Sequence, residues 1–360
     1  MNERVPADSD RVLADIVLGR RELTEALYPL CEAEGLIAIA PVIAEAVQLR
    51  HQADLHEAVA AEMTRCRHDA AVLAALAEAG IATLVFKGGA LAHTHYESSW
   101  HRTRSDIDIL VREADTEAAI ERLAQLGYSA GDSIPGRVSI AELAFYKTLE
   151  FGVVHAVDLH WRFNSSWHLA RLVAFDDLWP TRQPIPGVGG FCPAPAWSLI
   201  IAALHRIAHE HYTAYEVDGQ SKVEGDLTLW AYDASLIAGT MNTEDWQWLQ
   251  TLCIERDLAE PVIALINRAS ELFEVDVPDD VLASLQAARR RSGVFSTQGF
   301  LSKLLQSFLA VPGARLRLAW LREQLFPPSI YMRDVYGHEG WLWSGYIKRI
   351  ARGLLRSAGR

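Results

Sequence analysis

The sequence lacks the features that mark several common protein classes. Its 360 residues include only four cysteines and no Cys-x-x-Cys pair, which argues against a disulfide framework or a zinc knuckle and suits a reducing compartment. No apolar run approaches the roughly 20 residues of a transmembrane helix. The acidic, polar start MNERVPADSD lacks the pattern of a secretory signal. We therefore expect a cytoplasmic protein with no transmembrane segment.

Three widespread site motifs are also missing. The chain has no G-x-x-x-x-G-K-[ST] loop, no G-x-G-x-x-G before a helix and no H-E-x-x-H. These absences argue against a Walker-type phosphate loop, a Rossmann dinucleotide site and a zincin-type zinc site. His205 and His209 lie four apart in a helical pattern, but without such a motif we expect them to pack rather than to bind zinc.

Charge is distributed unevenly along the chain. There are 46 acidic and 34 basic residues, for a net charge of −12. From Gln286 onward, 13 lysines and arginines face only three acids, so this end carries about +10 and the remainder about −22. A strongly acidic body is a poor general nucleic-acid binder, because phosphate contacts need Lys and Arg. The basic end could still meet an anionic partner.

Periodicity predicts an α+β fold, with a small mixed β-sheet core between N-terminal helices and a C-terminal helical domain. Residues 10–80 have a helical pattern, and strands are expected at IATLVF, SDIDILV, AFYKTLEF and VVHAVDLHWRF, the last two paired through Gly152. We expect four regions: N-terminal helices at 1–80, the α/β core at 81–180, a helical domain at 193–325, and 326–360 as a loop, FPPSIYMRDVYGHEG, followed by a basic amphipathic helix. That last helix either docks on the protein or contacts an anionic membrane, an RNA or a protein.

Acidic residues recur on one face of two predicted strands. Asp106 and Asp108 are two apart and so project together, while Ile107 faces the core. Asp158 and His160 share a face of a second strand in the same way. Carboxylates that converge need a cation between them, and two-metal phosphoryl-transfer sites have this arrangement. Each pattern taken alone also fits a solvated strand or a backbone-bound acid.

A glycine turn and two arginines precede these acids. Lys87, Gly88 and Gly89 end a predicted strand and open a helix, where backbone N–H groups can meet an anion. Arg102 and Arg104 could reach triphosphate oxygens or simply neutralise the acids. Ser105 could bond a phosphate or cap the strand. Among the remaining candidates, we expect Asp233 to cap a helix or to pair with a buried Arg or His, and His93 and His95 to be exposed.

The segments FKGGALAHTHY, SDIDILV and VDLHWRF together resemble the DNA polymerase beta-type nucleotidyltransferase superfamily. Within it, the chain is most similar to a bacterial group of uncharacterised nucleotidyltransferases, and more distantly to abortive-infection nucleotidyltransferase toxins. The spacing from Gly89 to Asp106 is longer than in the minimal polymerase-beta pattern, and some relatives have serine in place of Gly89.

The resemblance implies roles for the matching residues. Gly88 and Gly89 would hold the nucleotide phosphates, and Lys87 and Arg102 would meet the triphosphate. The carboxylates would bind two divalent ions, usually Mg²⁺ or alternatively Mn²⁺, with a third carboxylate serving as ligand and base; these are Asp106, Asp108 and Asp158.

The function expected from this resemblance is transfer of an NMP from an NTP such as ATP to an acceptor hydroxyl, with pyrophosphate leaving. The acceptor could be a protein, an RNA or a small molecule. Two alternatives stay open. The chain could be a non-catalytic accessory protein that keeps the fold, or a toxin-like nucleotidyltransferase that acts on tRNA.

Overall fold

The computed structural model describes residues 7–131, 133–209, 215–217, 220–222, 226–289, 300–336 and 343–347. The chain forms two compact units. The first comprises Met1–Ala74, Val85–Ile107 and Thr181–Val294, and the second comprises Ala75–Leu84, Asp108–Pro180 and Phe295–Arg360. The division at residues 80, 180–193 and 325 expected from the sequence stays a prediction.

The strands confirm the predicted α+β class. Seven of them form one mixed sheet in the order β3-β4-β5-β2-β1-β7-β6, and the boundary between the units runs through β2 and β1. The strands of this sheet are β1 (Thr83–Phe86), β2 (Asp106–Val111), β3 (Ser129–Ala130), β4 (Glu142–Thr148), β5 (Val154–His160), β6 (Gln183–Pro184) and β7 (Phe191–Cys192). A separate pair consists of β8 (Tyr215–Val217) and β9 (Gln220–Lys222).

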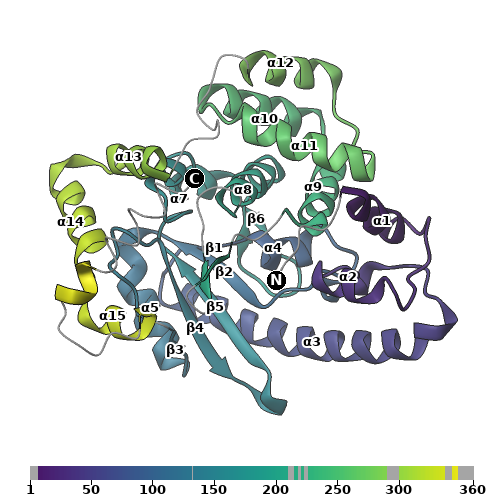
Figure 1. Ribbon diagram of the computed structural model, residues 1–360, viewed down its shortest axis with the longest axis horizontal. Helices are drawn as coiled ribbons and strands as arrows, with labels where there is room; N and C mark the ends of the chain where they lie inside the picture. Colours follow the sequence, from purple (N-terminus) through teal and green to yellow (C-terminus); the bar gives the residue numbers. More distant parts are fainter. Residues whose placement is uncertain are drawn as a thin grey trace. The chain divides into compact units, whose positions relative to one another are not determined.

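The sequence pattern predicts helix throughout residues 10–80. In the structure, the N-terminal part of the chain is instead helical in three separate pieces. The pieces are α1 (Ala7–Val17), α2 (Tyr28–Ala33) and the long α3 (Gln48–Glu78) (Figure 1). Gly19 and Gly35 have φ of 70° and 68°, a left-handed backbone that ends a helix. Apolar side chains of α1 and α2 pack with those of α9 (Thr228–Thr240) and α11 (Ala259–Phe273) in one core.

The remaining helices of the first unit follow the predicted apolar periodicity. They are α4 (Lys87–Thr94), α8 (Pro195–Ile207), α10 (Thr243–Glu255) and α12 (Asp279–Arg289), and α10, α11 and α12 pack side by side (Figure 1). Asn242 begins α10 by accepting hydrogen bonds from the N–H groups of Glu244 and Asp245 at 2.8 and 3.0 Å, which satisfies donors that a helix start leaves open. In the described part of the chain, no helix is long and apolar enough to cross a membrane.

Among the described residues, the second unit contains the β4–β5 hairpin and several helices. Gly152, with φ of 76°, lies in the connection between the strands, and the antiparallel register pairs Ala144 with Asp158 and Glu142 with His160. The helices are α5 (Thr116–Gln125), α6 (Trp167–Ala170), α7 (Phe175–Leu178), α13 (Phe300–Ala310), α14 (Gly313–Leu325) and α15 (Ser329–Tyr336). Single 3₁₀ turns occur in both units at Ile37–Ile39, Glu45–Val47, Ser99–His101, Glu113–Asp115, Glu150–Gly152 and Trp179–Thr181.

The predicted loop FPPSIYMRDVYGHEG is wrong over residues 329–336, which form α15. Pro328 precedes the helix, where its missing N–H is harmless, and its carbonyl accepts from the Met332 N–H at 3.1 Å. Of the predicted basic amphipathic helix, residues 343–347 are helical. Its other residues, including most of the basic ones, lie outside the described residues.

Glu323 of α14 holds the loop that leads into β4. Its Oε2 accepts from the N–H groups of Val138 and Ser139 at 3.0 and 2.8 Å, and from the Ser139 hydroxyl at 3.0 Å. Gly136 lies against the same carboxylate, since a Cβ at this position would lie 2.1 Å from Glu323 Cδ. The absence of a side chain at 136 therefore makes room for the acid that binds the loop.

We expect Glu323→Ala to lower the free energy of unfolding by about 2 kcal/mol, because three donors lose a charged acceptor. Gly136→Ala should also destabilise the protein, by roughly 1–3 kcal/mol through overpacking. In the Glu323→Ala background the second change should cost less, because the obstructing carboxylate is gone. Denaturant unfolding of the four proteins measures this coupling.

The control is Glu121→Ala, which removes an exposed acid from α5 and should change stability by less than about 0.5 kcal/mol. Strict additivity of the two substitutions would contradict the assigned contact.

Candidate functional site

Strand β2 presents Asp106 and Asp108 on one face. Ile107 and Ile109 between and beyond them are buried in the core, with 2% and 0% exposure. Because side chains alternate along a strand, this burial directs both carboxylates to the opposite face. Asp108 is itself buried, while Asp106 is half-buried. The alternation predicted from the sequence is thus present in the structure.

Strand β5 brings a third carboxylate and a histidine. Val157 and Leu159 are fully buried, so Asp158 and His160 point to the other side of the strand. Ligand atoms of Asp108, Asp158 and His160 all lie within 4.8 Å of one another, an arrangement that could hold a metal ion. The structure therefore gathers two of the three predicted carboxylates around His160.

His160 lies between two carboxylates. Its Nε2 is 3.0 Å from Asp108 Oδ1, and its Nδ1 is 3.0 Å from Glu142 Oε2. The ring is almost fully buried, whereas Glu142 is 47% exposed. The Nε2 contact with Asp108 has hydrogen-bond geometry, whereas the Nδ1 contact with Glu142 is within ion-pair distance without such geometry. His160 is therefore placed to hold the Asp108 carboxylate in a fixed orientation.

Glu142 is a site residue that the sequence reasoning missed. It lies opposite His160 in the β4–β5 register, which is symmetric about residue 151. A hairpin centred on Gly152 would instead pair His160 with Ala144, so the sequence pattern alone does not predict the contact between His160 and Glu142.

The glycine turn between β1 and α4 has an unusual backbone. Lys87, the first helical residue, has φ of 54°, a left-handed conformation that costs non-glycine residues roughly 1–2 kcal/mol. A Cβ on Gly89 would approach Ile107 Cγ1 to 3.3 Å, and one on Gly88 would lie 3.5 Å from Arg102 Cζ. Gly89 thus allows α4 to pack closely on β2, and Gly88 lies against a guanidinium.

Arg102 forms a buried ion pair with Asp233, as expected for that aspartate. Its Nε and Nη2 donate to Asp233 at 2.9 to 3.1 Å, and the Tyr96 hydroxyl donates to the same carboxylate at 2.7 Å. Burial opposes the charged form of Arg102, but Asp233 and, more weakly, Asp106 outweigh it, so the pKa of Arg102 is raised. The guanidinium remains charged beside Gly88.

Arg104 is more deeply enclosed, with a side chain only 2% exposed. It donates to Glu62 at 2.9 to 3.2 Å, to Asp69 at 2.6 Å and to the Asp106 carbonyl at 3.0 Å. Burial works against its charge, yet Asp69 and Glu62 raise its pKa. Arg104 thus joins α3 to the start of β2. Ser105, which lies between Arg104 and Asp106, is exposed.

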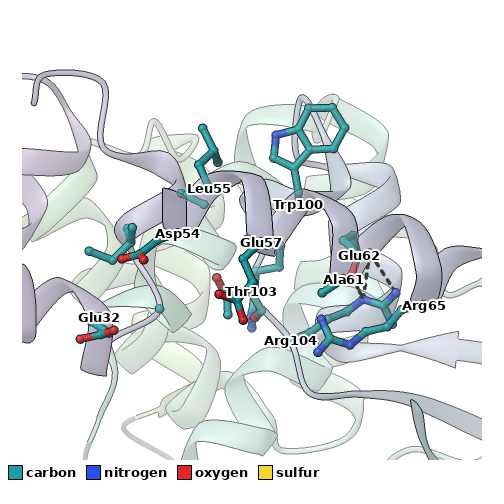
Figure 2. A pocket seen from close by; sticks show the side chains of 15 residues that line it. Glu32, Asp54, Leu55, Glu57, Ala61, Glu62, Arg65, Trp100, Thr103 and Arg104 are labelled. Atoms are coloured by element: carbon teal, nitrogen blue, oxygen red, sulfur yellow. Dashed lines mark hydrogen bonds and ion pairs between the residues drawn. The ribbon is translucent and has the colours of Figure 1, made fainter. Parts of the chain in front are cut away.

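The segment between the glycine turn and β2 lines a pocket of about 370 Å³ against α3, α2 and the Ile37–Ile39 turn (Figure 2). Trp100, Arg102 and Thr103 come from this segment, and Glu57 and Arg65 come from α3. The long spacing between Gly89 and Asp106 therefore builds one wall of a pocket that shares Arg102 with the glycine turn.

Comparison with protein families matches residues 21–293 to the model described as "Uncharacterised nucleotidyltransferase". Comparison with curated proteins finds no match. Among solved structures, the chain is similar to an antigenic nucleotidyltransferase-like protein from Paracoccidioides brasiliensis, with 13% identity, a TM-score of 0.38, and coverage of 61% of this chain and 95% of that one. Because the family model spans well over half of its length, the chain belongs to this family of uncharacterised nucleotidyltransferases.

Proposed function

We propose that the protein is a metal-dependent nucleotidyltransferase that transfers an NMP from an NTP to an acceptor hydroxyl, with pyrophosphate leaving. The observation that carries this proposal is the cluster of Asp108, Asp158 and His160 on two neighbouring strands. Two unit charges at 4 Å interact by about 4 kcal/mol at an effective dielectric near 20. Against a typical total stability of about 5–15 kcal/mol, such a cluster is best explained by a cation that binds there.

The ligand types fit Mg²⁺ or Mn²⁺. Carboxylate oxygens are the donors that these hard ions prefer, and Asp106 supplies another on the same face of β2. His160 Nε2 is already engaged with Asp108 Oδ1, so we assign His160 as a positioning residue. When bound, the ions would activate the attacking hydroxyl and offset the charge of the triphosphate.

The other residues divide into substrate contacts and supports. Asp158, the less buried of the two clustered carboxylates, is our candidate for accepting the proton of the attacking hydroxyl. Gly88 and Lys87 are proposed to meet the triphosphate at the start of α4, where backbone N–H groups favour anions. The contacts to triphosphate expected of Arg102 and Arg104 are not retained, because Asp233 occupies the guanidinium of Arg102 and Glu62 and Asp69 occupy that of Arg104.

The first test uses the purified full chain, Mg²⁺ and α-labelled NTPs with a cell lysate as the source of acceptor. We expect label transfer that falls at least about 100-fold in Asp108→Asn and Asp158→Asn, because several kcal/mol of charge stabilisation are lost. The labelled acceptor would identify a protein, an RNA or a small molecule, and label in tRNA would favour the toxin alternative.

Asp276→Asn, a change at an exposed loop aspartate, is the matched control and should retain full activity. If wild type neither binds NTP with Mg²⁺ nor transfers label, while remaining folded by circular dichroism, the non-catalytic accessory alternative is supported instead.

The second test concerns His160. Because outer-shell partners of metal ligands typically contribute 10–100-fold to affinity, we expect His160→Asn to weaken Mn²⁺ binding by about that factor. Glu142→Gln should have a smaller effect in the same direction, since it touches only the far side of the ring. Electron paramagnetic resonance of free Mn²⁺ during titration measures both affinities.

The matched control is His155→Asn, which removes a buried histidine from the opposite face of β5. His155 contacts the Tyr128 hydroxyl at 2.8 Å, so this variant reports the loss of a core histidine alone. Equal Mn²⁺ affinity in all four proteins would refute the positioning role.

A further inference from the structure

A second group of metal-ligating side chains lies in the first unit, apart from the carboxylates proposed for catalysis. Glu62 and Cys66 are four apart on α3 and therefore share a face of that helix. His93 reaches them from α4, and its side chain is 10% exposed rather than on the surface as the sequence had suggested. Three side chains from two helices thus offer oxygen, sulfur and nitrogen to one point.

Their spacing is close to that of a tetrahedral zinc site. Cys66 Sγ is 3.2 Å from Glu62 Oε1 and 3.8 Å from His93 Nε2, and His93 Nε2 is 3.9 Å from the same Glu62 oxygen. Zinc bonds of about 2.3 Å to sulfur and about 2.0–2.1 Å to nitrogen and oxygen place tetrahedral ligands about 3.3–3.6 Å apart. Shifts of only a few tenths of an ångström would bring the three atoms to those positions.

The local charge also fits a dication. Arg104 holds Glu62 and Asp69 together, so these three side chains sum to −1, and a Cys66 thiolate would bring the sum to −2. The guanidinium would then act as an outer-shell partner that fixes the Glu62 carboxylate, as ligating carboxylates commonly require. A bound Zn²⁺ would leave this buried cluster neutral.

The protonation states of the free site are consistent with metal binding. Burial, reinforced by Arg104, lowers the pKa of His93, which keeps its imidazole neutral and able to ligate. Burial and Glu62 raise the pKa of Cys66 to about 11, so the metal-free residue is a thiol. On binding, the S–H bond breaks, the sulfur electron pair forms the bond to the metal, and the proton passes to solvent.

We propose that Glu62, Cys66 and His93 bind a zinc-class divalent ion that ties α3 to the helix following the glycine turn. A soft thiolate and an imidazole select zinc over magnesium, so this site differs in chemistry from the carboxylate cluster of β2 and β5. The Ser99 hydroxyl, 3.8 Å from Cys66 Sγ, borders the fourth coordination position, which a water would fill.

The test uses the full chain, stripped with chelator and then titrated with Zn²⁺ or Co²⁺. We expect about one Zn²⁺ per chain by elemental analysis, release of about one proton on binding, and a thiolate-to-cobalt charge-transfer band. Cys66→Ser should lose the band, and both Cys66→Ser and His93→Asn should bind Zn²⁺ more than about 100-fold less tightly, beyond the loss typical of outer-shell changes.

Cys192→Ser and His95→Asn are matched controls, because Cys192 lies on β7 and His95 just after α4, bonded to Thr94. Both should retain the ion. Zn²⁺ should raise the melting temperature of wild type but not that of Cys66→Ser. Because each protein is compared with and without Zn²⁺, this test remains valid even if a variant is less stable than wild type.

Asp108→Asn separates this proposal from the catalytic one, since it should keep Zn²⁺ while losing label transfer. Absence of Zn²⁺ binding in wild type, a charge-transfer band that persists in Cys66→Ser, or loss of Zn²⁺ in Asp108→Asn would each overturn the assignment.

Discussion

A buried arginine fixes the position of the strand on which the proposed chemistry depends. Arg104 binds Glu62 and Asp69 of α3 and the carbonyl of Asp106 at the first residue of β2. A buried charge that loses its partners destabilises a protein by several kcal/mol, so neither the arginine nor its acids can be exchanged freely. The first residue of β2 is thus held at a defined point on α3.

Several buried acids among the described residues are paired with arginines. We assign these paired acids a supporting role, in contrast to the carboxylates proposed to bind metal. Asp233 is neutralised by Arg102, and Glu62 and Asp69 are neutralised by Arg104. The net acidic charge of the chain therefore says little about its interior. Within the second unit, the group that contacts Asp108 is His160, an imidazole rather than a permanently charged guanidinium.

Sequence patterns predicted strands β1, β2 and β5 well because each is a short apolar run that the sheet buries almost continuously. Burial of Ile107, Val157 and their neighbours directs the acids to the other face, and the family resemblance identifies these acids as candidate metal ligands. Partners distant in sequence could not be predicted in this way. Arg104 meets acids 35 and 42 residues earlier, and the sequence of α3 offers several acids on different faces. The helix α15 was missed because Pro328 indicated a loop, although it only marks where the helix begins.

The left-handed backbone at Lys87 makes lysine an unfavourable residue for this turn. A lysine there adopts a φ of 54°, which glycine would adopt without strain. Residues held in such conformations concentrate at functional positions, because the surrounding structure must enforce them. If folding stability alone mattered, glycine would be favoured over lysine at this position. A lysine here thus gives up some folding stability and places an ammonium group 5.1 Å from the centroid of the Phe86 ring.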